Sequence, residues 1–181
     1  SRITILYVGL LYKTKGVDVL IKAINESYKK HKNIRLRIIG DGPEYESLKA
    51  LCNELDLGDI TDFKKNVDYG SIVSAYDKAD IFVHPGRWNE PFGRTILEAM
   101  ARKVPVLVSN IGAPPQIVND KELIFESEDY IELSNKINML VEDNKLREFY
   151  SKKLYKKVLS YAPEKLLPKV LNVYKLVIRN N

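Results

Sequence analysis

Short runs of consecutive apolar residues alternate with amphipathic stretches along the chain. The runs are rich in Val and Ile, which is typical of strands, and the stretches between them repeat apolar residues at helical spacing. The predicted strands are residues 3–8, 34–39, 59–63, 81–83, 104–108 and 123–125, and the predicted helices are residues 17–24, 48–55, 72–76, 92–102, 130–141, 145–159 and 163–178. Strand and helix therefore alternate along most of the sequence.

The predicted strands are mostly apolar throughout, so both of their faces are expected to be buried. Such strands form parallel sheets that helices cover on both sides. The sequence therefore predicts the α/β class, with a Rossmann-like parallel sheet. Ligands of these sheets bind beyond the carboxyl ends of the strands. The loops that follow Val8, Ile39, Val83 and Val108 are all rich in Gly or Pro, and they are the places to search for a site.

Length and composition indicate a single domain. With 181 residues, of which 45% are hydrophobic, the chain has enough material for one core, and we predict that residues 1–181 form one unit. No run of about 18 uncharged apolar residues occurs. The one cysteine, Cys52, excludes a disulfide framework, and neither His31 nor His84 belongs to a metal-ligand motif. We expect a cytoplasmic protein without a metal or cofactor.

The formal net charge of +5 raises the question of a polyanionic partner. Lys and Arg are scattered, and no aromatic platform lies among them, so nucleic acid is not the expected partner. Residues 136–175 hold a local excess of lysine on predicted helices. Contact of this basic end with the inner face of an acidic membrane is an alternative to an ordinary solvated surface.

Lys15 lies in the loop that joins the first predicted strand to the first predicted helix. A cation at a helix start opposes the helix dipole, but the free N–H groups there attract phosphate, and a lysine can then serve the bound anion. A solvated surface lysine is the alternative interpretation. The loop from Gly9 to Gly16 lacks the Gly-x-x-x-x-Gly-Lys-Ser/Thr pattern, so an ATPase phosphate loop is not supported.

Residues 84–98 form the most informative segment. Pro91 has no N–H to lose at a helix start, so the residues after it present the first free backbone donors. These residues are Phe92, Gly93, Arg94 and Thr95. Because Gly93 has no side chain, a ligand can approach its backbone closely. We predict that a phosphate or a sugar hydroxyl docks there.

Two glutamates flank this predicted helix start. Glu98 lies among apolar residues and needs partners that donate hydrogen bonds, which the paired hydroxyls of a ribose would supply. The alternatives are an i,i+4 ion pair with Arg94 for Glu98 and stabilisation of the helix dipole for Glu90. His84 is a candidate proton-transfer group, with a buried histidine at a strand end as the alternative.

Two further loops carry weaker signals. Gly40, Asp41 and Gly42 would let the backbone approach a nucleobase, although a tight turn explains them equally well. Residues 111–116 form either a backbone wall for a ligand or a rigid turn.

Together these segments resemble the C-terminal domain of group-one, or family-four, retaining glycosyltransferases of the GT-B fold. The matching pieces are Tyr7-Val8-Gly9 with Lys15-Gly16, Ile38-Ile39-Gly40-Asp41-Gly42-Pro43, Ala79-Asp80-Ile81-Phe82-Val83, Glu90-Pro91-Phe92-Gly93 with Leu97-Glu98-Ala99-Met100-Ala101, and Val104-Pro105-Val106. They span almost the whole chain, and their ordered combination is highly specific.

The resemblance implies a role for each matching residue. Glu90 would contact the transferred sugar and Lys15 the diphosphate, which makes these two the expected catalytic residues. Glu98 would bind the ribose hydroxyls. The expected donor-binding set also includes Phe92, Gly93, Arg94, Thr95, Gly42 and Gly9. The substrate would be a nucleoside diphosphate sugar, and an absent N-terminal domain would bind the acceptor, a glycan or a lipid-linked sugar.

The chain departs from the family pattern at three places. Leu10 stands where arginine is usual, so one diphosphate-binding charge is missing. Gly86 replaces a serine, and Gln116 replaces the glutamate of the Gly-Gly-x-x-Glu pattern. We therefore expect an unusual donor affinity or sugar choice.

The resemblance implies transfer of a sugar, of the hexosyl type, with retention at the anomeric carbon. We expect the isolated chain to bind donor weakly and not to turn over. A related GT-B epimerase or sugar phosphorylase is the first alternative. A noncatalytic α/β interaction module is the second, and a nucleic-acid-binding module is the third.

Overall fold

The computed structural model describes residues 2–65 and 67–179. Within them lies a parallel sheet of six strands in the order β3-β2-β1-β4-β5-β6. The strands are β1 (Ile3–Val8), β2 (Ile34–Ile39), β3 (Thr61–Lys64), β4 (Ile81–His84), β5 (Val106–Ser109) and β6 (Ile124–Phe125). The α-helices are α1 (Val17–Lys30), α2 (Tyr45–Glu54), α3 (Tyr69–Asp77), α4 (Arg94–Ala101), α5 (Pro114–Val118), α6 (Tyr130–Glu142), α7 (Asn144–Val158) and α8 (Pro163–Arg179). The predicted α/β class is confirmed.

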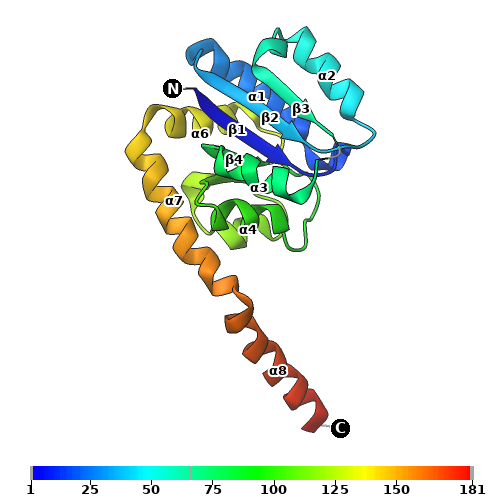
Figure 1. Cartoon of the computed structure of the whole chain (residues 1–181), viewed down its shortest axis with the longest axis vertical. Coiled ribbons are helices and arrows are strands. Elements are labelled where there is room, and N and C mark those ends of the chain that lie inside the picture. Colours follow the sequence, from blue (N-terminus) through cyan, green and yellow to red (C-terminus); the bar gives the residue numbers. More distant parts are fainter. Residues whose placement is uncertain (1, 66, 180–181) are drawn as a thin grey trace.

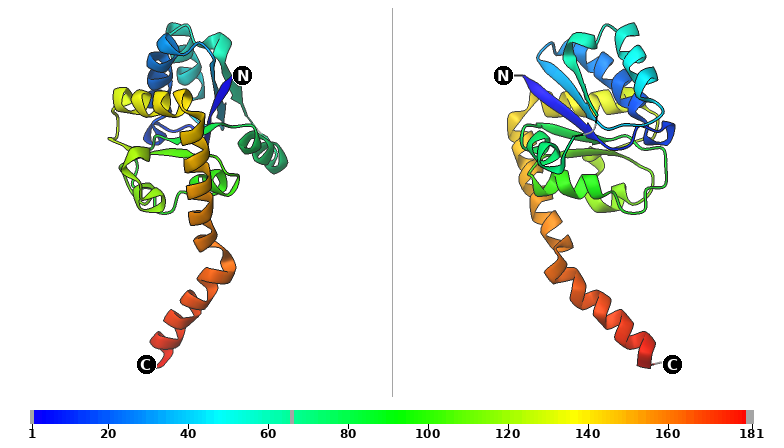
Figure 2. Two further views of the ribbon diagram at one scale, coloured as in Figure 1. Left: turned by 90° about the vertical axis from the view of Figure 1, so that its left-hand side faces the viewer. Right: turned by 45° about the vertical axis from the view of Figure 1, so that its right-hand side comes forward.

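Helices cover both faces of the sheet (Figures 1 and 2). Helix α1 packs against α2 and α6 on one face, whereas α3 lies on the other. Helix α4 packs on β4 and β5, and α7 packs against α4. The central strands are buried as the apolar pattern predicts, with β4 and β5 buried at every position.

Most element boundaries differ from the sequence prediction by a few residues, and three of these differences have a clear local cause. Helix α4 begins at Arg94 rather than at Phe92, because Gly93 adopts a left-handed conformation (φ +71°) that no helix continues. The third strand starts at Thr61, since residues 58–60 form a 3₁₀ turn. Residues 114–118 form a short helix that the predicted turn at 111–116 did not include.

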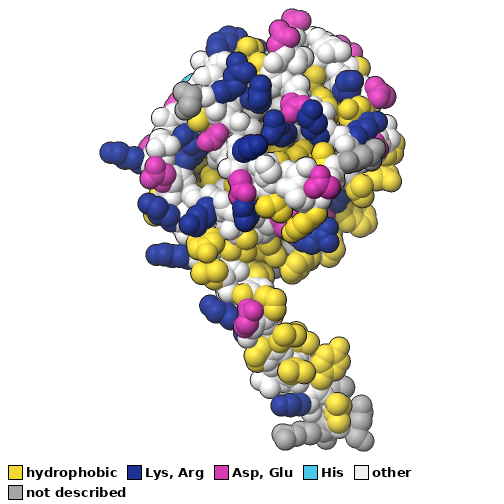
Figure 3. All heavy atoms as spheres, in the orientation of Figure 1, with side chains coloured by type: hydrophobic (Ala, Val, Ile, Leu, Met, Phe, Trp, Pro, Cys, Tyr) yellow, Lys and Arg dark blue, Asp and Glu magenta, His cyan; other side chains and the backbone are white. Residues whose placement is uncertain are grey.

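Helix α8 extends away from the body of the domain (Figures 1 and 2). Its exposed large apolar side chains include Leu167, Val170, Leu171, Val173, Tyr174 and Ile178. Figure 3 shows apolar side chains gathered along this helix with few charges between them. Within residues 2–65 and 67–179, no helix combines the length and the apolarity that a bilayer span requires.

Candidate functional site

The candidate site lies where the strand order reverses. Strand β1 is bonded to β2 on one side and to β4 on the other, and the helices that follow β1 and β4, namely α1 and α4, diverge to opposite faces of the sheet. Such a divergence opens a crevice in which parallel α/β sheets bind ligands. Two adjoining pockets occupy this crevice.

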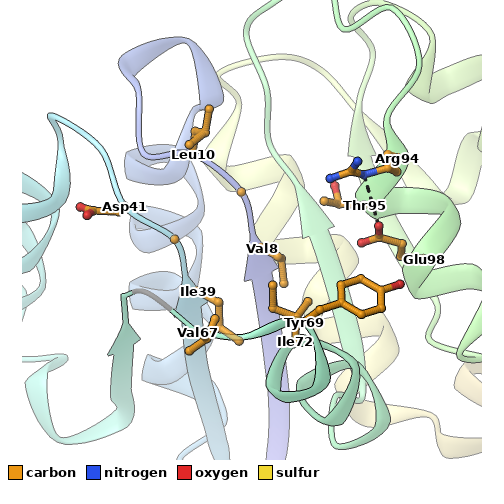
Figure 4. A pocket seen from close by; sticks show the side chains of 12 residues that line it. Val8, Leu10, Ile39, Asp41, Val67, Tyr69, Ile72, Arg94, Thr95 and Glu98 are labelled. Atoms are coloured by element: carbon orange, nitrogen blue, oxygen red, sulfur yellow. Dashed lines mark ion pairs between the residues drawn. The ribbon is translucent and has the colours of Figure 1, made fainter.

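The first pocket, here named the apolar pocket, has a volume of about 290 Å³. It is lined by Val8, Gly9, Leu10, Ile39, Gly40, Asp41, Val67, Tyr69, Ile72, Arg94, Thr95 and Glu98. Figure 4 shows its two sides: apolar side chains at the ends of β1 and β2, and the polar side chains of Arg94 and Glu98 on α4. A flat ring with a polar edge fits such a lining.

The second pocket, here named the charged pocket, has a volume of about 250 Å³. It is lined by Tyr7, Val8, Gly9, Leu10, Lys15, His84, Glu90, Gly93, Arg94 and Thr95. The two pockets share residues at the end of β1 and at the start of α4, so they form one continuous cleft.

Lys15 and Glu90 meet in the charged pocket. Lys15 Nζ donates to Glu90 Oε2 at 2.8 Å, and the two side chains are 25% and 20% exposed. The hydrogen bond from Lys15 is the main cause that lowers the pKa of Glu90 below its ordinary value. Residues 75 positions apart in sequence are therefore brought together as an ion pair.

The loop that carries Lys15 has a different shape from the predicted helix start. Lys15 ends a 3₁₀ turn (Lys13–Lys15), and α1 begins only after Gly16. Gly16 has φ +67°, and a Cβ there would lie 2.0 Å from the carbonyl oxygen of Pro85. Only glycine lets this corner rest on the loop that follows β4.

Glu90 is supported from the other side by the loop that precedes α5. The Ala113 N–H donates to the Glu90 carbonyl oxygen at 2.9 Å. Residues 111–116 do not line either pocket. The loop therefore holds the backbone of Glu90 and lies outside the lining of both pockets.

Glu98 lines the apolar pocket and already has two partners. Arg94 Nε lies 3.3 Å from Glu98 Oε1, which is the i,i+4 pair considered from the sequence, but the Arg94 side chain is 85% exposed. On the buried side, the hydroxyl of Tyr76 donates to Glu98 Oε2 at 3.1 Å. Burial, and then the charge of Glu98, raise the pKa of Tyr76 well above its ordinary value, so the phenol stays a donor.

The start of α4 points into the cleft. Gly93, Arg94 and Thr95 line the charged pocket, and as the first helical residues Arg94 and Thr95 have no earlier carbonyl of the helix to bond. Phe92 lines neither pocket and is 51% exposed. The geometry therefore separates Phe92 from the other donor-binding candidates.

The two remaining glycine candidates occupy different positions. Gly9 lines both pockets. Gly42 lines neither pocket and lies between two hydrogen bonds that join its loop to Leu11: Leu11 N to Asp41 O at 2.9 Å, and Glu44 N to Leu11 O at 3.0 Å. The neighbours Gly40 and Asp41, not Gly42, reach the apolar pocket.

His84 forms part of the floor of the charged pocket and is 7% exposed. Burial lowers the pKa of His84 to about 4, against the opposing effect of Glu90. The imidazole is therefore neutral near pH 7. His84 is both a buried histidine at a strand end and a residue that faces the site.

Several lining residues were not selected from the sequence. Tyr69 and Ile72 come from α3, which begins earlier than the predicted helix, and Tyr7 contributes its ring from β1. Asp68 was a signal for this earlier start, because its side chain caps α3 by accepting from Ser71 N at 3.0 Å. The described residues contain no group of three or more His, Cys, Asp or Glu side chains placed to hold a metal ion.

Comparison with known proteins adds an independent line of evidence. Residues 1–157 match the family model described as glycosyl transferases, group 1. An uncharacterised glycosyltransferase of Methanocaldococcus jannaschii is 31% identical over 96% of this chain and 45% of its own length. The matched region spans only 31% to 45% of the length of eight curated relatives.

Solved structures agree with this match. The catalytic domain of a cholesterol-α-glucosyltransferase from Helicobacter pylori superposes with a TM-score of 0.82 at 26% identity, over 90% of this chain and all of that one. The C-terminal domain of a group 1 glycosyltransferase from Francisella tularensis gives a TM-score of 0.79 at 28% identity, over 88% of this chain and 85% of that one.

Proposed function

Because the chain belongs to the group 1 glycosyltransferase family, we propose that it is the donor-binding half of a GT-B enzyme. The enzyme transfers a hexosyl group from a nucleoside diphosphate sugar to an acceptor hydroxyl, with retention at the anomeric carbon. The apolar pocket takes the base and ribose of the donor, and the charged pocket takes the diphosphate and the sugar.

One observation carries this proposal: a single cleft at the reversal of the strand order holds an apolar end, a carboxylate at Glu98 and a lysine at Lys15. A nucleoside diphosphate sugar has the same sequence of groups, namely a flat base, vicinal hydroxyls, a diphosphate and a sugar. The distribution of charge along the cleft therefore matches the distribution of groups along the donor.

Charge accumulates on the diphosphate as the sugar leaves it. In this proposal Lys15 and the free N–H groups of Arg94 and Thr95 stabilise that charge, which is how fixed donors in a cleft lower an activation barrier. Lys15 exchanges part of its contact with Glu90 for the phosphate, and Glu90 then contacts the hydroxyls of the transferred sugar. Glu98 accepts from the ribose hydroxyls. None of these roles needs a metal or a further cofactor.

The acceptor is assigned to a part of the protein outside these residues. The start of α4 and the loops after β1 and β4 leave one side of the cleft open, and a second half facing it would bind a glycan or a lipid-linked sugar. We propose that the chain alone does not turn over, and that the enzyme works in the cytoplasm at the inner face of the membrane. The lysines of α7 would favour an acidic membrane surface.

A thermal-shift panel of UDP, GDP, ADP and their sugar conjugates tests donor binding, since a ligand that prefers the folded state raises the melting temperature. We expect one base to stabilise the chain, and Glu98→Gln to reduce that shift. Glu148→Gln, a substitution of the same kind on the exposed face of α7, is the control. If no nucleotide stabilises either this chain or the full-length protein, the donor-binding proposal is wrong and a noncatalytic module becomes the better interpretation.

A further inference from the structure

Arg87 lies between the loops that carry the two charged residues of the site, and it lines neither pocket. It follows β4 and precedes Glu90 by three positions. Its side chain is 20% exposed, which is low for an arginine outside a binding pocket. This burial raises the question of what the guanidinium does there.

The guanidinium joins three separate segments. It forms a bidentate pair with Asp18 in the first turn of α1, with N–O distances of 2.8 and 2.7 Å, and it donates to the Lys13 carbonyl oxygen at 2.9 Å. A second carboxylate, that of Glu128, lies 3.3 Å from its Nε. The pKa of Arg87 is raised chiefly by the hydrogen bonds to Asp18, so the group stays charged. Planar, bidentate pairs of this kind fix geometry as well as charge.

The main chain of Arg87 adds a further bond to the same loop. Its N–H donates to the Thr14 carbonyl oxygen at 2.8 Å. Lys15 is thus flanked on one side by Lys13 and Thr14, both bonded to Arg87, and on the other by Gly16, which rests on Pro85. These contacts between the Lys15 turn and the loop after β4 all come from Pro85 and Arg87.

We propose that Arg87 is a positioning residue that holds Lys15 against Glu90 and so presents the Lys15 ammonium to the donor diphosphate. The functional part of this inference rests on the proposed donor binding. Arg87 does not itself contact the ligand. By joining the loop after β1 to the loop after β4, it fixes the position of the Lys15 ammonium.

The first test needs no ligand. The pKa of the Glu90 carboxyl is measured by NMR of its side-chain carbon in the wild type, in Arg87→Gln and in Lys15→Gln. Because Lys15 holds this pKa below its ordinary value, we expect Arg87→Gln to raise it in the same direction as Lys15→Gln. A folded Arg87→Gln protein with an unchanged Glu90 pKa would overturn the proposal.

The second test compares two ligands that differ in the diphosphate alone. Isothermal titration with UDP and with uridine, or with the GDP or ADP pair if that base is the one bound, reports whether the phosphate contact is affected. We expect Arg87→Gln to weaken the diphosphate about tenfold and the nucleoside less than about twofold. In the Lys15→Gln background, the same change should have almost no further effect. An equal loss for both ligands, or additive losses with Lys15→Gln, would mean a merely structural role.

Two variants keep the tests interpretable. Arg102→Gln removes another arginine that pairs in bidentate fashion with an aspartate, Asp77, away from both pockets, and should change neither readout. If Arg87→Gln does not fold, Asp18→Asn takes its place in both tests. It weakens the hold on Arg87 without removing the guanidinium, and it should shift both readouts in the same direction. If neither the wild-type chain nor the full-length protein binds any of the diphosphates, the proposed function fails, while the Glu90 measurement still decides the role of Arg87.

Discussion

The apolar pocket and the charged pocket share the end of β1 but are held in place by different forces. The apolar pocket is lined largely by strand ends and by α3, whose side chains are placed by the sheet and its packing. The charged pocket depends on ion pairs and hydrogen bonds between loops that are far apart in sequence, such as Lys15 with Glu90. The geometry of the charged pocket is therefore expected to respond to pH and to single charge changes more strongly than the strand ends that line the apolar pocket.

The largest expected effect is the change of the free energy of unfolding with pH that His84, in the charged pocket, causes. His84 is neutral in the fold, with a pKa of about 4, whereas an unfolded histidine titrates near 6.5. The unfolded state therefore binds more protons than the folded state in this range, and stability decreases as the pH falls from 6.5 to 4. The loss from this group is about 3 kcal/mol at pH 4.

Denaturant unfolding of the wild type and His84→Leu at pH 7 and pH 4 measures this effect. The carboxylates titrate in both proteins, so the difference between the two pH dependences isolates the histidine. Equal losses of unfolding free energy in the two proteins would contradict the prediction.

A smaller effect is expected on the polar edge of the apolar pocket. Tyr76 is 2% exposed, and Tyr76→Phe removes the hydroxyl that donates to Glu98 while it leaves the ring in place. Loss of one such hydrogen bond, about 1 kcal/mol, corresponds to roughly fivefold weaker binding of a ligand that uses Glu98.

The measurement for Tyr76→Phe is the ratio of affinities for UDP and 2′,3′-dideoxy-UDP, or for the matching pair of another base. This ratio should fall, because only UDP carries the ribose hydroxyls. Tyr150→Phe, a change at a buried tyrosine of α7 outside both pockets, is the control and should leave the ratio unchanged. A ratio that stays constant in Tyr76→Phe would show that this hydroxyl does not orient Glu98.

The smallest expected effect is a gain in affinity for the diphosphate, from a substitution at the boundary between the two pockets. Leu10 lines both of them and is 59% exposed, so Leu10→Arg adds a cation beside the diphosphate position without opening a cavity. Exposed charge pairs contribute up to about 1 kcal/mol, so we expect diphosphate binding to tighten by about two- to fivefold at low salt and less at high salt.

Tyr12→Arg supplies the control for Leu10→Arg. It adds the same charge two positions away, on a side chain that lines neither pocket. Titration calorimetry at two salt concentrations compares them. Equal gains in both variants would mean that net charge, not position, sets the affinity.

Local sequence patterns predicted the order of strands and helices well, because each of these elements depends on the spacing of apolar residues over a short stretch of chain. The apolar runs at residues 3–8 and 34–39 became β1 and β2 with the same bounds. The boundary of α4 was wrong by two residues, since the pattern does not reveal that Gly93 takes a left-handed conformation. The short helix α5 was missed because its five residues are too few to establish a period.

The candidate site was predicted only in part. The motif positions Lys15, Glu90 and Glu98 were selected from the sequence, and the structure brings them to one cleft. The partners that hold them were not. Tyr76 and Arg87 act through contacts with residues 22 and 69 positions away, and no local pattern carries that information.

Local patterns along the chain were enough to predict the alternation of strands and helices, and they marked the glycines and charged residues of the loops. Hydrophobic periodicity and turn-forming residues act over a few positions, so they can be recognised in the sequence without a structure. In contrast, the position of β4 beside β1, the contact of Lys15 with Glu90, and the absence of Gly42 and Phe92 from the lining of the two pockets became visible only in the folded chain. These facts depend on strand order and on close approach between distant loops, which follow from the burial of the whole core rather than from any one segment.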